Sequence, residues 1–158
     1  MIKVGLLGAG FVGQVHSQAW AQVEYAELVA VAGLPRETAA KLASSAGGMA
    51  TDSIEEILTD DEVDVIDICL PTDLHEKYVI QSLRSGKHIL CKKPLALSLE
   101  SSDLIFQVAE QAGKVLMVAQ VVRFWPEYLA CHHIVSGQSI GQLEALRRSL
   151  ESGAPVKL

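Results

Sequence analysis

The chain of 158 residues is 49% hydrophobic, 20% charged and 5% aromatic, with a formal net charge of −6. Its length is enough for one ordinary domain with a sizeable buried core, and its aliphatic-rich composition is typical of a compact α/β protein. The acidic balance argues against a general binder of nucleic acid or of anionic membranes.

Short runs of Val, Ile and Leu alternate with longer amphipathic segments along most of the chain. This alternation predicts βαβ units, and therefore an α/β fold with a doubly wound, mostly parallel sheet and helices on both faces. The expected strands span 3–7, 28–32, 65–69, 88–90 and 115–118, and the expected helices span 13–22, 36–45, 54–58, 74–84 and 99–111. Gly47 and Gly86 predict two helix ends, and Ser98 predicts a helix N-cap.

The pattern changes after Val122, where RFWPEY brings an aromatic pair and a proline. An apolar-periodic segment follows over 129–135, Gly137 and Gly141 bracket a turn, and 143–150 is predicted as one further strand. This last strand has no evident partner downstream. Because an unpaired apolar strand edge recruits another chain, we expect a homo-oligomer that forms through this C-terminal segment.

The cysteines and the N-terminus indicate the compartment. The three cysteines form no CxxC pair and are odd in number, which fits reduced thiols better than a disulfide scaffold. The N-terminus MIKVGLLGAGFVG lacks a signal-peptide cleavage pattern, and no apolar stretch approaches the ~18 residues that a membrane span needs. We therefore expect a cytoplasmic protein without a membrane partner.

The motif GAGFVG is the strongest chemical signal, because it follows the strand-like run KVGLL directly and opens a helical segment. In this pattern Gly8 permits a tight turn, Gly10 lets the backbone approach a pyrophosphate, and Gly13 lets the helix pack on the strand. The backbone amides and the helix dipole then bind the anion. A glycine-rich turn without a ligand is the alternative, but the strand–loop–helix context favours a dinucleotide.

The choice between NAD and NADP depends on the end of the second strand. The dinucleotide fingerprint asks for an acidic residue about 20 positions after the glycines, as a ligand of the ribose hydroxyls, and Gly33 stands there. Losing that charge-assisted hydrogen bond costs about 1.5–3 kcal/mol. Arg36 lies where a cation would meet the 2′-phosphate of NADP, although a solvated residue of the first helical turn explains it equally well. The cofactor is NAD or NADP, with NADP favoured.

Four segments together resemble the Gfo/Idh/MocA family of oxidoreductases: GAGFVGQVH, DVIDICLPTDLHEKY, SGKHILCKKPLA and VVRFWPEY. The resemblance implies a Rossmann-like NAD(P)-binding domain over 1–120. Residues 121–158 would then hold a connector helix and the first strand of a truncated C-terminal domain. It also implies hydride transfer between the nicotinamide and a sugar-like or cyclitol-like polyol, or its ketone. A non-catalytic dinucleotide-binding module or sensor that lacks a substrate domain is the alternative function.

The stretch CKKPLA matches the place where the family carries its EKP motif. The resemblance therefore puts the catalytic lysine at Lys93, which would handle the proton of the substrate hydroxyl, and a substituted glutamate at Lys92. It also implies a cis peptide bond between Lys93 and Pro94. Because side chains alternate along a strand, Lys92 is expected to point away from Lys93. A solvated lysine at a strand end is the alternative for Lys93.

The candidate site thus consists of one catalytic residue and a set of cofactor-binding residues. The catalytic residue is Lys93. The cofactor-binding residues are Gly8, Gly10, Phe11, Val12, Gly13, Arg36, Leu70, Pro71, Thr72, His75, Lys93 and Pro94.

Four histidines are open to other interpretations. His75 is equally a cofactor-side residue or a helix cap, and His16 is a packing or capping residue. Cys131, His132 and His133 look like metal ligands, but consecutive helical residues point about 100° apart and do not converge. We expect no metal site.

Overall fold

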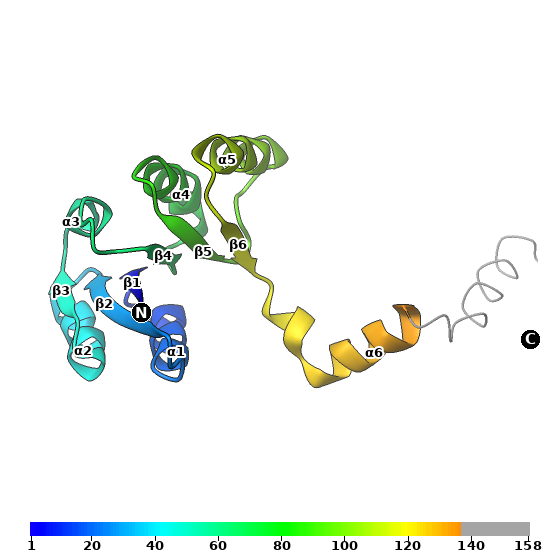
Figure 1. Cartoon of the computed structure of the whole chain (residues 1–158), viewed down its shortest axis with the longest axis horizontal. Helices are drawn as coiled ribbons and strands as arrows, with labels where there is room; N and C mark the ends of the chain where they lie inside the picture. Colours follow the sequence, from blue (N-terminus) through cyan, green and yellow to red (C-terminus); the bar gives the residue numbers. More distant parts are fainter. Residues whose placement is uncertain (137–158) are drawn as a thin grey trace, which may run out of the picture. The chain divides into compact units, whose positions relative to one another are not determined.

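The computed structural model describes residues 1–136. This part of the chain divides into a first compact unit, Met1–Ala119, and a second unit that begins at Gln120. The first unit contains one sheet with helices on both faces (Figure 1).

Six parallel strands form the sheet, in the order β3-β2-β1-β4-β5-β6. They are β1 (Ile2–Leu7), β2 (Ala26–Ala32), β3 (Met49–Thr51), β4 (Val65–Ile68), β5 (His88–Lys92) and β6 (Leu116–Ala119). The chain builds outward from β1 through β2 to β3, then returns beside β1 and builds in the opposite direction. Open parallel sheets form a ligand crevice at the carboxyl ends of their strands where the order reverses in this way.

Two layers of helices cover the sheet. Helices α1 (Phe11–Trp20) and α2 (Arg36–Ala46) lie on one face, and α3 (Ile54–Leu58), α4 (His75–Arg84) and α5 (Leu99–Ala112) lie on the other (Figure 1). Because side chains alternate along a strand, β1 sends Val4 and Leu6 into the α1–α2 cluster and Leu7 into the α3–α5 cluster. The predicted doubly wound α/β fold is confirmed.

The predicted elements of the first unit all form, with ends within two residues of the expected ones. The helix ends at Gly47 and Gly86 are confirmed, as is the N-cap, where the amide of Ser101 donates to Ser98 Oγ at 3.1 Å. Strand β3 is an addition. Its three residues, MAT, form no apolar run that the sequence pattern reveals.

The second unit begins with the 3-10 turn η2 (Val121–Phe124), and α6 (Pro126–Ser136) follows. Helix α6 contains the predicted apolar segment 129–135, and Pro126 occupies its first position, where a missing N–H costs nothing. The predicted turn at 137–141 and strand at 143–150 lie outside the described residues. The assignment of 121–158 to a second domain stays a prediction.

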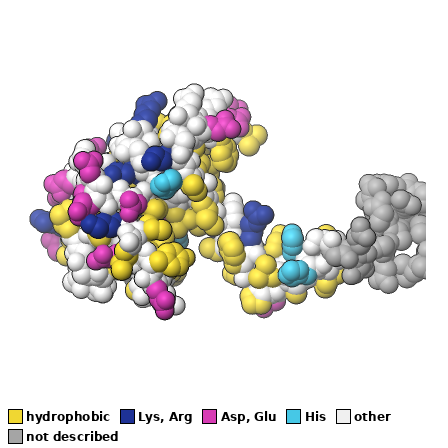
Figure 2. Space-filling model, in the orientation of Figure 1, with side chains coloured by type: hydrophobic (Ala, Val, Ile, Leu, Met, Phe, Trp, Pro, Cys, Tyr) yellow, Lys and Arg dark blue, Asp and Glu magenta, His cyan; other side chains and the backbone are white. Residues whose placement is uncertain are grey.

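Exposed apolar side chains gather at the β6 end of the sheet (Figure 2). They include Phe106 of α5 together with Val115 and Met117 beside and on β6. None of the helices within residues 1–136 combines the length and the apolar character that crossing a membrane requires.

A buried carboxylate ties α1 to the centre of the sheet. Asp67 of β4 is fully buried, and it accepts hydrogen bonds from Trp20 Nε1 at 2.7 Å and from His16 Nδ1 at 2.9 Å. A buried charge needs such partners, because its desolvation is costly. The hydrogen bond to Asp67 raises the pKa of His16 above its usual value, while partial burial of the ring acts in the opposite direction.

This pair makes stability depend on pH. Since the folded-state pKa of His16 exceeds that of the unfolded chain, the protonated pair stabilises fully at pH values below the unfolded pKa, about 6.5. The contribution disappears as pH rises through the folded-state pKa. We expect the difference in unfolding free energy between the wild type and His16→Gln to be largest near pH 5 and to shrink by about pH 9. Urea unfolding across this range measures it, and a difference that grows with pH would contradict the assignment.

Candidate functional site

The loop between β1 and α1 is built on two close backbone approaches. Gly8 has φ +105°, and a Cβ there would lie 2.7 Å from the carbonyl oxygen of Cys69. A Cβ on Gly13 would collide with the carbonyl oxygen of Gly8. Glycine is required at both positions, and the loop therefore packs against both α1 and the end of β4.

Helix α1 begins at this loop with no side-chain cap. Its N-cap residue is Gly10, and its first turn contains no acidic residue. The first amides of a helix have no partner within the helix, and they carry the positive end of its dipole. An anion is therefore the ligand that this end of α1 binds best. The space beside Gly10 is open, since a Cβ there would meet nothing within 4 Å.

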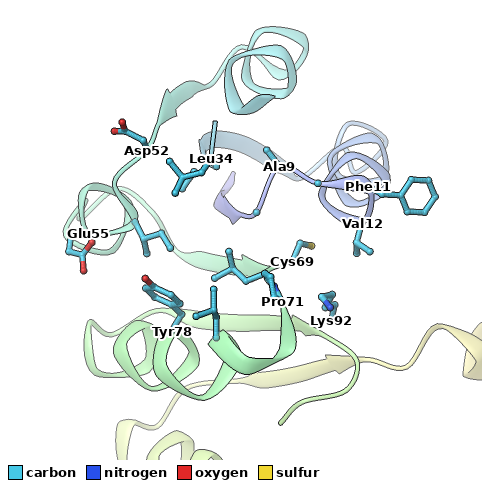
Figure 3. Close-up of a pocket in the computed structure, with 17 residues that line it drawn as sticks. Ala9, Phe11, Val12, Leu34, Asp52, Glu55, Cys69, Pro71, Tyr78 and Lys92 are labelled. Carbon is cyan, nitrogen blue, oxygen red and sulfur yellow. The ribbon is translucent and has the colours of Figure 1, made fainter. Parts of the chain in front are cut away.

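A cleft of about 650 Å³ opens over this loop, at the carboxyl ends of β1, β2, β4 and β5 (Figure 3). It is lined by Gly8, Ala9, Gly10, Phe11, Val12, Ala32, Gly33, Leu34, Asp52, Ile54, Glu55, Cys69, Leu70, Pro71, Leu74, Tyr78 and Lys92. The cleft lies at the reversal of strand order, where the topology predicts a ligand.

The structure brings part of the predicted site to the cleft. Six of the predicted cofactor-binding residues line it: Gly8, Gly10, Phe11, Val12, Leu70 and Pro71. The remaining predicted residues do not: Gly13, Arg36, Thr72, His75, Lys93 and Pro94. Gly13 acts instead through the packing of α1, and the direct roles of the others stay predictions.

Charged groups mark the two ends of the cleft. Asp52, which follows β3, and Glu55 of α3 lie at one end, and Lys92 of β5 lies toward the other (Figure 3). Sequence reasoning did not assign the two carboxylates to the site. Strand β3, which Asp52 follows, went unrecognised, and Glu55 lies in the predicted helix 54–58, where no motif marks it as a ligand.

The two lysines at the end of β5, Lys92 in the strand and Lys93 just after it, are placed differently from each other. Lys92 is half-buried and lines the cleft, whereas Lys93 is exposed and does not line it. The peptide bond between Lys93 and Pro94 is cis, as the resemblance implied. Of these two lysines, the one that lines the cleft is therefore the residue that replaces the family's glutamate.

Gly33 stands where the dinucleotide fingerprint has its acidic ribose ligand, and the packing around it is also too tight for a larger side chain. A Cβ on Gly33 would lie 2.7 Å from Cβ of Ala9, so an acidic side chain does not fit there without movement of the loop. Arg36 is exposed on the first turn of α2, and its Nη2 donates to the carbonyl oxygen of Ala50 at 3.2 Å.

One cluster has the composition of a metal site. His16, Asp67 and Cys69 place one ligand atom each within 4.8 Å of one another. Their hydrogen bonds already account for this arrangement, and burial raises the pKa of the Cys69 thiol well above its usual range. The cluster is therefore assigned to the hydrogen-bond network of Asp67. Cys131, His132 and His133 are exposed on α6.

The fold and the cleft define a Rossmann-type dinucleotide-binding domain. A family model described as "Oxidoreductase family, NAD-binding Rossmann fold" matches residues 2–120. The chain belongs to this family, Gfo/Idh/MocA, and the resemblance seen in the motifs is confirmed.

Individual relatives agree with this assignment. Inositol 2-dehydrogenase of Rhizobium meliloti is 35% identical over 144 residues, which cover 90% of this chain and 43% of the relative. Levoglucosan dehydrogenase of Pseudarthrobacter phenanthrenivorans is 30% identical over 155 residues, 92% of this chain and 40% of the relative. A 3-ketoreductase from Actinomadura kijaniata, solved in complex with NADP, superposes with a TM-score of 0.81 at 26% identity over 89% of this chain and 45% of that one. The chain spans less than half the length of these relatives.

Two glycine variants separate anion binding from folding. Gly10→Ala places a methyl group in open space, so we expect stability close to that of the wild type, whereas the methyl blocks the approach of a pyrophosphate to α1. Affinity for NADH or NADPH should then fall by roughly tenfold or more. Gly13→Ala forces α1 away from the carbonyl of Gly8, and it should lose both stability and binding. Thermal unfolding and nicotinamide fluorescence measure the two effects, and full affinity in Gly10→Ala would contradict the assigned site.

Proposed function

We propose that the cleft binds NAD or NADP with its pyrophosphate at Gly10 and the N-terminus of α1. The observation that supports this most strongly is the uncapped start of α1 above a glycine loop at the reversal of strand order. Gly33 occupies the position of the adenosine-ribose ligand, so the adenosine half lies on the β2–β3 side. The nicotinamide half then lies toward β5 and Lys92.

We propose that the complete reaction is hydride transfer between the nicotinamide and a carbon that bears a hydroxyl group. When bound, the cofactor supplies the hydride acceptor or donor. Lys93 follows β5 directly, and its amine takes the hydroxyl proton during oxidation and returns it during reduction. Relatives named for inositol and levoglucosan support a sugar-like or cyclitol-like polyol, or its ketone, as the substrate.

A non-catalytic dinucleotide-binding module is the second candidate. It is favoured by one observation: the residue at the cleft is Lys92, in place of the family's glutamate, while Lys93 stays outside it. The predicted self-association through 143–150 involves residues outside the described part of the chain. It stays a prediction, as does the cytoplasmic location.

One pair of experiments decides between the two candidates. We expect NADH and NADPH to bind the wild type, with nicotinamide fluorescence as the readout, and absence of binding by both would overturn the dinucleotide proposal. Reduction of NAD or NADP in the presence of myo-inositol or levoglucosan, followed by absorbance, then tests catalysis. Lys93→Met should abolish turnover and leave cofactor affinity within about threefold. Binding without turnover by the wild type would favour the module.

For cofactor choice, we propose that NADP has the advantage. Gly33 removes the carboxylate that would repel a 2′-phosphate. The exposed guanidinium of Arg36, on the first turn of α2 three residues after Gly33, supplies a cation on the same side of the cleft. The carboxylates of Asp52 and Glu55 at the same end of the cleft act against this preference.

Arg36→Gln tests this proposal. Removing one charge-assisted hydrogen bond should weaken NADPH binding by roughly tenfold and leave NADH binding unchanged. Lys41→Gln, a charge change at an exposed site on the same helix, is the matched control and should leave both affinities unchanged. An equal loss for both cofactors in Arg36→Gln would contradict a role for Arg36 at the 2′-phosphate.

A further inference from the structure

His75, the first residue of α4, lies between two loops of the functional edge. Its side chain is completely buried. Nε2 lies 2.9 Å from the carbonyl oxygen of Leu70, and Nδ1 lies 2.9 Å from the carbonyl oxygen of Pro94. Leu70 belongs to the turn after β4 that lines the cleft, and Pro94 belongs to the segment after β5 that carries Lys93. One ring therefore spans the two segments.

The two contacts are polar, and this distinguishes them from ordinary core packing. Backbone carbonyl groups accept hydrogen bonds, so each ring nitrogen meets an acceptor. A neutral imidazole has one N–H and donates to one of the two carbonyls, whereas a ring that carries both protons donates to both. The thiol of Cys91, 3.5 Å from Nδ1, is a further neighbour on β5 and itself donates to the carbonyl of Lys92 at 3.4 Å.

An apolar side chain of similar size would fill the same space and would offer these two carbonyls no donor in place of the ring. A backbone carbonyl that loses a donor from the protein must find water instead or stay unpaired, and the unpaired state costs free energy. The polar ring thus fixes the separation of two loop segments, whereas an apolar ring would only pack between them. Because the Leu70 turn is a wall of the cleft, that separation decides how far Lys93 lies from a ligand in it.

We propose that His75 is a positioning residue that holds the Lys93–Pro94 segment against the cleft-lining turn at Leu70. His75 itself does not line the cleft, so it acts on the ligand through these two backbone segments. The effect of His75 on a bound dinucleotide rests on the proposed function. The link between the two segments belongs to the free protein as well, and it is measured separately.

The first experiment needs no cofactor. Amide hydrogen exchange over 70–74 and 92–97 is compared in the wild type, His75→Ala, His75→Gln and the control His88→Gln. His88 lies at the opposite end of β5, where its Nδ1 accepts from the amide of Val115 at 3.1 Å. We expect both segments to exchange faster in His75→Ala by about threefold or more, with partial recovery in His75→Gln, whose amide donates again. Acceleration confined to one segment, or equal in His88→Gln, would overturn the link.

The second experiment reads the position of Lys93 relative to the ligand. Labelling of lysine amines is quantified by mass spectrometry with and without NADPH. We expect NADPH to protect both Lys92 and Lys93 in the wild type and in His88→Gln. In His75→Ala, Lys92 stays protected because β5 holds it, and Lys93 is labelled at the rate of the free protein.

Protection of Lys93 in His75→Ala equal to that in the wild type would overturn the positioning role. His75→Gln serves as the test variant if His75→Ala does not fold, and it should show intermediate protection of Lys93. If the wild type binds neither NADH nor NADPH, the proposed function fails, and the exchange experiment still decides whether His75 links the two segments.

Discussion

The site depends on the close approach of three backbone segments at the carboxyl edge of the sheet. The carbonyl of Gly8 leaves no room for a Cβ on Gly13, and the end of β4 leaves none on Gly8. The amide of Gly8 donates to Ala32 O at 2.8 Å, so the loop is also bonded to the end of β2. This contact geometry directs the start of α1 toward the cleft. A larger residue at either glycine would move the helix and its free amides away from the place where an anion binds.

The charged groups that stabilise the fold are different from those that face the cleft. The buried carboxylate of Asp67 accepts hydrogen bonds from Trp20 and His16 of α1 and from the thiol of Cys69. Burial raises the pKa of Cys91 to about 12, so this thiol stays neutral beside the cleft. The charged groups that face the ligand space, Asp52, Glu55 and Lys92, are exposed or half-buried. They are therefore free to interact with a bound molecule, and changing one of them does not remove a bond that the fold requires.

The sequence predicted the parts of the molecule that periodicity and glycine spacing encode. Strand and helix patterns revealed the doubly wound sheet, and GAGFVG revealed the anion-binding loop, because both signals are local. Strand β3 was missed because three residues carry no periodic signal, and with it Asp52, which follows the strand directly. Glu55 lies in a helix that was predicted, but no motif marked it as part of the site. The placement of Lys92 and Lys93 also escaped prediction. The turn that follows a strand decides where the side chains of its last residues point. A motif match shows which residue corresponds to the family's lysine, but it does not show which side chain lines the cleft.

Strand pairing and a single side-chain contact together place the residues at the end of β5. Strand β5 pairs with β4 and β6 on its two sides from Ile89 to Cys91, and the backbone of Lys92 is still paired with Ala119 of β6. A change from glutamate to lysine at this position therefore reverses a charge at the cleft while the backbone stays in place. Lys93 is one residue beyond the last paired position, so the sheet no longer holds it. The placement of Lys93 requires a contact outside the sheet. The ring of His75, at the start of α4, supplies one through the carbonyl oxygen of Pro94. Strand β5 therefore holds the charged group of Lys92 at the cleft, and the contact between His75 and Pro94 holds the segment that carries Lys93.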